Sequence, residues 1–96
     1  MRRVFQAMES AQKSLLDGAG ISPFDGRLRG WREKARVLFD RLWSEAGCFG
    51  NANESRFGLL YAHCLGRTIS DGGIPIPENL LPKDREIEAL LKGGRS

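Results

Sequence analysis

The sequence has 96 residues, of which 15 are Lys or Arg and 12 are Asp or Glu, so its formal net charge is +3. A chain of this length is typical of one domain, and we expect residues 1–96 to form a single helical unit. No apolar run approaches the ~20 residues that cross a bilayer, which excludes a membrane-spanning helix. Glu9 and Lys13 interrupt the apolar stretch that a secretory signal needs, so we expect a cytoplasmic protein.

Apolar residues recur at helical spacing in four segments, which Gly- and Pro-rich stretches separate. The predicted helices span residues 4–16, 26–46, 52–65 and 83–91. No segment alternates apolar and polar residues as a half-buried strand does. Gly18 and Gly66 are the expected ends of the first and third helices, because glycine readily adopts the left-handed conformation that closes a helix.

The second predicted helix has the widest apolar stripe, and we expect it to be the central helix. Its apolar residues cover an arc of about 140° when successive residues turn by about 100°. We expect this helix to pack antiparallel against the third helix. The sequence therefore predicts an all-α fold, a compact four-helix bundle. The glycines and prolines of residues 70–77 predict an extended connection before the last helix, because proline keeps the preceding residue extended.

The aromatic residues of the second helix indicate a protein–protein interface. Two tryptophans and a phenylalanine on one helix are a large apolar load for a small domain, so one edge of the stripe is open to a partner. Two further apolar residues project from the polar backs of the second and third helices. The predicted interface consists of Trp31, Phe39, Trp43, Val37 and Leu59. The alternative is that the three aromatic side chains belong to the core of the chain itself.

Arginines on the same helix suggest a different partner. Arginine accounts for 11 of the 15 basic residues, and its guanidinium suits phosphate recognition. Arg29, Arg32 and Arg36 fall on one flank of the apolar arc and are the candidate nucleic-acid contacts. Four carboxylates lie among six basic residues between positions 25 and 46, which leaves a charge of +2, low for a helix that binds a nucleic-acid groove. The alternative is a solvated rim of i, i+4 ion pairs.

Few residues could carry chemistry. Cys48 lies shortly before the predicted third helix, where a helix N-terminus lowers a thiol pKa, and it is the candidate reactive thiol. His63 and Cys64 are adjacent, but neighbours on a helix point about 100° apart and cannot easily hold one ion. One histidine and two cysteines also fall short of the four ligands of a structural zinc site, so we expect no metal and no cofactor.

The sequence has neither a phosphate-binding glycine loop nor a Gly-x-Ser-x-Gly nucleophile motif, so we expect that the protein is not an enzyme. It therefore predicts a small, non-catalytic helical interaction module, either a homodimer or a subunit of a larger assembly. A protein partner, most simply a second copy, is the first hypothesis, and nucleic acid is the alternative. A membrane is not an expected partner.

Overall fold

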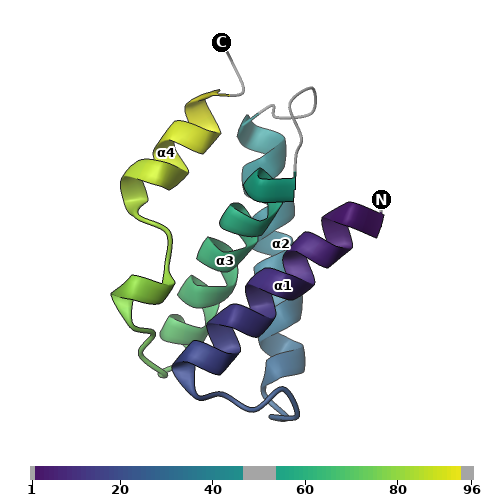
Figure 1. Ribbon diagram of the computed structural model, residues 1–96, viewed down its shortest axis with the longest axis vertical. Helices are drawn as coiled ribbons and strands as arrows, with labels where there is room; N and C mark the ends of the chain where they lie inside the picture. The colour runs from purple at the N-terminus through teal and green to yellow at the C-terminus, as the bar shows by residue number, and fades with distance from the viewer. Residues whose placement is uncertain (1, 47–53, 94–96) are drawn as a thin grey trace.

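The computed structural model describes residues 2–46 and 54–93, which form an all-α bundle (Figure 1). Its elements are α1 (Arg2–Ala19), α2 (Leu28–Ala46), α3 (Glu54–Asp71), the short 3-10 helix η2 (Glu78–Leu80) and α4 (Asp84–Gly93). None of the described residues forms a strand. The prediction of an all-α four-helix bundle is confirmed.

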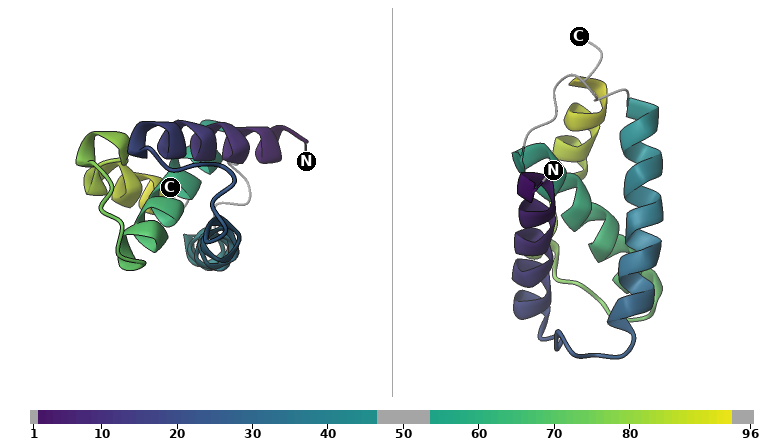
Figure 2. Two further views of the ribbon diagram at one scale, coloured as in Figure 1. Left: turned by 90° about the horizontal axis from the view of Figure 1, so that it is seen from below. Right: turned by 90° about the vertical axis from the view of Figure 1, so that its right-hand side faces the viewer.

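Helix α3, and not α2, occupies the centre of the bundle. It packs against α1, α2 and α4, and Figure 2 shows α1 and α2 on different sides of it. Its inward side chains have exposed fractions of 0%: Leu60, Cys64, Leu65 and Ile69. The expectation that the second helix is central is wrong, because α3 has apolar side chains toward several neighbours whereas α2 has one buried stripe.

Glycines end α1 and α3, but later in the chain than predicted. Gly20 and Gly73 have φ angles of 72° and 100°, the left-handed region that glycine adopts without strain. The residue after each glycine donates its N–H to the carbonyl five positions back, which satisfies a carbonyl at the end of the helix. Both helices therefore end in the way that the glycines predict, but at a different glycine in each case.

Gly66 is an interior residue of α3 and does not end it. The chain leaves α3, turns through η2 and returns, so that the side chain of Leu81 packs directly over the Gly66 Cα. A Cβ at this position would overlap the Leu81 methyl group. The glycine is thus explained by close packing, and α3 continues to Asp71 instead of ending at residue 65.

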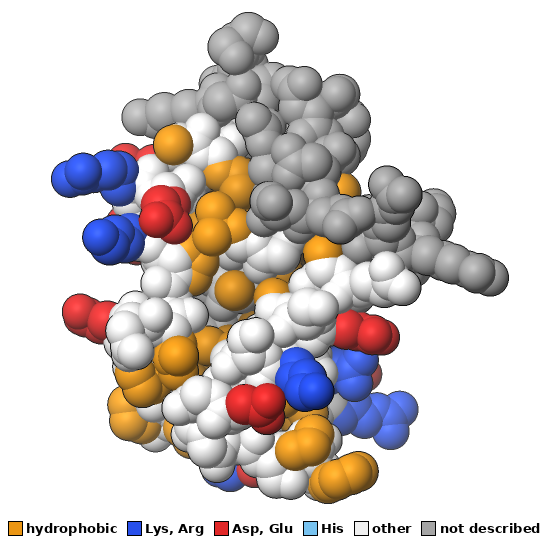
Figure 3. Space-filling view, viewed as in Figure 1, with side chains coloured by type: hydrophobic (Ala, Val, Ile, Leu, Met, Phe, Trp, Pro, Cys, Tyr) orange, Lys and Arg blue, Asp and Glu red, His pale blue; other side chains and the backbone are white. Residues whose placement is uncertain are grey.

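The connection between α3 and α4 packs its isoleucines on the core. Residues 74–77 have neither helix nor strand, and Ile76 is buried while Ile74 is half-buried. Figure 3 shows hydrophobic side chains gathered between α4 and α1, with charged side chains on the outer edges of both helices. The molecule therefore keeps its charge at the edges of the face seen in this view.

Aromatic side chains of α2 and α3 form a cluster inside one chain. Trp31, Phe39 and Trp43 are 7%, 5% and 9% exposed. Phe39 stacks on Trp43 with ring centroids 5.8 Å apart, and the centroid of Phe57 lies 4.4 Å from that of Trp43. This corrects the expectation of an open aromatic edge, because α3 contributes a ring that covers the outer part of the stripe.

Asp25 caps the entry to α2. Its carboxylate accepts the Arg27 N–H at 2.9 Å and the Arg27 guanidinium at 2.7 Å. Hydrogen bonds from the side chain and backbone of Arg27 hold the pKa of Asp25 at about 2, below its ordinary value of 3.8. The Arg27 guanidinium also lies 5.1 Å from the ring centroid of Trp31, so the cap is joined to the core.

Asp25→Asn tests this cap through its pH dependence. Because the pKa of Asp25 is depressed in the folded chain, its charge stabilises the fold above pH 4 and stops doing so as the pH falls toward 2. Urea unfolding should show the wild type more stable than the variant at pH 6, with the difference shrinking between about pH 4 and pH 2. A difference that is constant with pH would contradict the assigned role.

Phe39→Ala tests whether the aromatic cluster is core or interface. Because Phe39 is buried within one chain, the substitution should lower the free energy of unfolding by about 3–5 kcal/mol. Val37→Ala, on the exposed side of the same helix, should change it by less than about 0.5 kcal/mol. Chemical denaturation measures both. If Phe39→Ala dissociates an oligomer and leaves the monomer's stability unchanged, the interface prediction holds instead.

Candidate functional site

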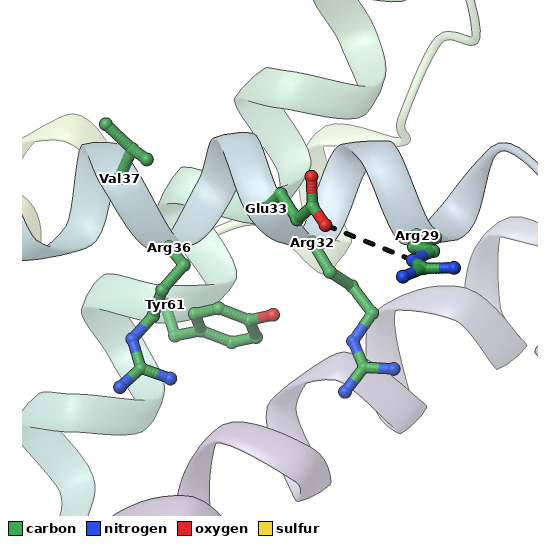
Figure 4. A pocket seen from close by; sticks show the side chains of 6 residues that line it. All are labelled: Arg29, Arg32, Glu33, Arg36, Val37 and Tyr61. Carbon is green, nitrogen blue, oxygen red and sulfur yellow. Dashed lines mark ion pairs between the residues drawn. The ribbon is translucent and has the colours of Figure 1, made fainter.

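A pocket of about 500 Å³ lies beside α2 (Figure 4). Among the residues that the structure describes, five from α2 and one from α3 line it: Arg29, Arg32, Glu33, Arg36, Val37 and Tyr61. The three arginines are spaced by three and four residues, which brings them to the same side of a helix. From the first to the last, α2 rises by about 10 Å, so the guanidiniums line the length of the pocket.

Positive charge dominates the described part of this lining, which has three guanidiniums and one carboxylate. Arg29 Nε lies 4.0 Å from Glu33 Oε1, and Arg36 Nε lies 3.6 Å from Asp40 Oδ1. Both ion pairs were predicted from their i, i+4 spacing, and both are solvent-exposed and therefore weak. Among the residues that the structure describes, Arg32 forms no ion pair with a carboxylate.

Tyr61 of α3 forms the floor of the pocket. It is 4% exposed, and its hydroxyl donates to Gln12 Oε1 of α1 at 3.3 Å, so three helices meet at this point. Burial raises the pKa of Tyr61 above its ordinary value of 10.0, while Arg32 and, more weakly, Arg36 act in the opposite direction. The phenol therefore keeps its proton at neutral pH and is available as a hydrogen-bond donor.

The structure separates the residues of the predicted interface. Trp31, Phe39 and Trp43 lie in the core, and Leu59 is half-buried against it. Val37 is 69% exposed and lines the arginine pocket. By contrast, the three predicted nucleic-acid contacts on α2 come together in one place. Sequence reasoning assigned no functional role to Tyr61, since a tyrosine on an apolar helix face is typical of core packing.

The Cys64 thiol and the His63 imidazole are not among the groups that line this pocket. Burial raises the pKa of Cys64 to about 12, so the thiol stays protonated and unreactive at neutral pH. His63 is half-buried, and burial together with the charge of Arg67 lowers its pKa below the ordinary value. Cys48, the candidate reactive thiol, lies outside the described residues. In the part of the chain that the structure describes, no three His, Cys, Asp or Glu side chains are grouped as metal ligands.

Two further pockets carry charges of both signs. One of about 280 Å³ is lined by Trp31, Lys34, Leu38, Thr68, Asp71 and Gly72. Another of about 380 Å³ is lined by Glu78, Leu81, Pro82, Lys83 and Asp84. Each has a single basic residue beside one or two acidic ones, so neither concentrates positive charge as the α2 pocket does.

Comparisons of the chain with known protein families, with curated proteins and with solved structures found no significant match. Among the described helices, none combines the length and the apolar character that crossing a membrane requires. Interpretation of the pocket therefore depends on its own chemistry. The guanidiniums along the pocket and the protonated phenol at its floor are donors, and such a set suits an anionic ligand that accepts hydrogen bonds.

Proposed function

We propose that the chain is a non-catalytic nucleic-acid-binding module that holds a phosphate backbone at Arg29, Arg32 and Arg36. The observation that carries the proposal is the convergence of three guanidiniums from successive turns of α2 on one pocket, whose described lining includes one carboxylate. Arginine makes paired hydrogen bonds with phosphate oxygens, and such contacts supply the affinity of sequence-independent binding.

The carboxylates between positions 25 and 46 oppose this binding less than their number suggests. Asp25 is occupied by Arg27, and Glu45 lies 3.4 Å from Arg41, on the part of α2 beyond the pocket. The remaining pairs, to Glu33 and Asp40, are exposed, and each such pair contributes about 0–1 kcal/mol. A phosphate can therefore replace either carboxylate at little cost.

The lining of the pocket supports binding without catalysis. General acid catalysis by a carboxyl group requires shielding from water, whereas the one carboxylate in the lining, Glu33, is exposed. The described lining has no serine, cysteine, lysine or histidine, and the Tyr61 hydroxyl donates to the neutral amide oxygen of Gln12 and not to a base. What remains is a set of donors that can hold an anion in place.

A triple variant with Arg29→Gln, Arg32→Gln and Arg36→Gln tests the proposal. Binding of a single-stranded oligonucleotide should weaken with salt in the wild type, and the slope of log K against log salt should fall by about 2 in the variant, at about 0.7 for each lost phosphate contact. Fluorescence anisotropy over a salt series measures the slope. Circular dichroism should show the variant folded, because all three side chains are exposed.

The matched control removes the same charge elsewhere, with Lys34→Gln, Arg41→Gln and Arg85→Gln at exposed positions outside the pocket. This variant should keep most of the wild-type salt slope. Equal losses in the two variants would show that net charge, and not the pocket, provides the binding. Absence of salt-dependent binding to any oligonucleotide at low ionic strength would contradict the proposed function.

A protein partner is the second candidate, and the exposure of Val37 favours it. An apolar side chain beside three arginines offers a contact that a phosphate backbone does not use, whereas protein interfaces combine apolar and arginine contacts. In this alternative the partner is a second copy of the chain or a subunit of a larger assembly.

Val37→Ser tests the second candidate. If the partner is a second copy, the wild type should sediment as a dimer at high concentration, and the variant should dissociate while its helical content stays unchanged. The fold should tolerate the substitution because the side chain is exposed. A wild type that remains monomeric over the whole accessible concentration range would contradict self-association.

A further inference from the structure

The Tyr61 hydroxyl, at the floor of the pocket beside α2, donates a long and therefore weak hydrogen bond. The Tyr61 hydroxyl reaches Gln12 Oε1 across 3.3 Å, whereas hydrogen bonds between a hydroxyl and an oxygen acceptor usually span about 2.5–3.0 Å. Tyr61 is nevertheless buried, so its hydroxyl is held at a fixed place below the guanidiniums. An anionic oxygen at this place would accept a shorter and stronger bond than the Gln12 amide does.

Arg32 and Arg36 line the same pocket as Tyr61. Arg32 and Arg36 both favour negative charge at the phenol oxygen, and Arg32 does so by its charge and as a hydrogen-bond donor. Figure 4 shows their side chains extending from α2 on either side of the Tyr61 ring, with the Tyr61 hydroxyl turned toward Arg32. Arg29 differs, because its side chain is 91% exposed whereas that of Arg36 is 50% exposed. Arg29 therefore belongs to the rim.

We propose that Arg32, Arg36 and the Tyr61 hydroxyl form a recessed subsite for one phosphoryl group, supplied by a single-stranded nucleic acid. The preference for a single strand rests on the proposed function, because that function supplies the source of the phosphoryl group. The existence of the subsite does not depend on the proposed function. A phosphodiester of a nucleic-acid strand carries its negative charge on two non-bridging oxygens, and each oxygen can accept more than one hydrogen bond, so one phosphate can accept from all three donor groups.

Because the subsite is recessed, its depth determines whether single-stranded or duplex nucleic acid can reach it. Tyr61 is buried where α1, α2 and α3 meet, so a phosphate must enter the pocket to reach its hydroxyl. The phosphates of a duplex are fixed on a stiff rod and contact only the exposed guanidiniums of the rim. A single strand bends freely and follows a basic groove, so it can lower one phosphate to the floor.

Tyr61→Phe tests the subsite because it removes only the hydroxyl and keeps the ring in its aromatic surroundings. Affinity for a single-stranded oligonucleotide should fall by about tenfold, the effect of one hydrogen bond to a charged group. Affinity for the duplex of the same sequence should not change, and the wild type should bind the single strand more tightly than the duplex. Arg29→Gln is the matched control, and it should weaken both complexes by the same factor.

A titration with inorganic phosphate, at constant ionic strength, tests the subsite without nucleic acid. In the ¹⁵N spectrum of the wild type, the Nε–Hε resonances of Arg32 and Arg36 should shift on saturation, with a smaller shift for Arg29. The shifts at a given phosphate concentration should be reduced in Tyr61→Phe. Circular dichroism and the unfolding midpoint confirm that the variant is folded.

The outcomes separate the two proposals. If oligonucleotides bind but Tyr61→Phe has no effect, or if the duplex binds as tightly as the single strand, the inference is wrong and the proposed function stands. If phosphate shifts the two arginine resonances while no oligonucleotide binds, the proposed function and the single-strand preference both fail, and the phosphoryl subsite is supported with a small phosphate ester as its ligand. If phosphate shifts neither resonance, there is no subsite.

Discussion

The burial of α3 among the other three helices is the constraint on which the rest of the structure depends. Its inward residues, Leu60, Leu65 and Ile69 among them, are closed off from water, which requires neighbours on more than one side. Helices α1 and α2 pack on different faces of α3 (Figure 2). The pocket follows from this arrangement, because Tyr61 of α3, which contacts Phe39 of α2 and Gln12 of α1, forms its floor.

The aromatic cluster fixes which face of α2 is turned toward the pocket. Phe39 contacts Tyr61 edge to face at 6.2 Å between centroids, and Ala35 is completely buried one turn earlier. Residues next to an inward position on a helix point about 100° away from it, so Arg36 is directed to the flank when Ala35 points inward. The core thus orients the arginines as well as stabilising the fold. Changes in the aromatic cluster therefore reach the pocket through the rotation of α2.

Helical periodicity predicted the elements and the grouping of the arginines, because both depend on residues that are near each other in the sequence. The separation between Tyr61 and Gln12 is 49 positions, and no local pattern predicts that contact. The same dependence on distant contacts explains the wrong prediction at Gly66. In the sequence this glycine resembles the end of a helix, and only the structure shows that Leu81 packs over it. This dependence also explains the aromatic stripe, since the spacing of residues on α2 gives their direction but does not reveal that Phe57 covers them. Tertiary packing decided each of these points.

The two tryptophans lie in different surroundings near opposite ends of one helix. Trp31 and Trp43 are separated by 12 positions, or about 18 Å along α2, and one lies under the Arg27 cation while the other stacks on Phe57. Each indole is therefore an intrinsic fluorophore in a different local environment. A chain that retains only one of them would give an optical signal from one end of α2, which makes it possible to follow fraying of each end separately without attaching a dye.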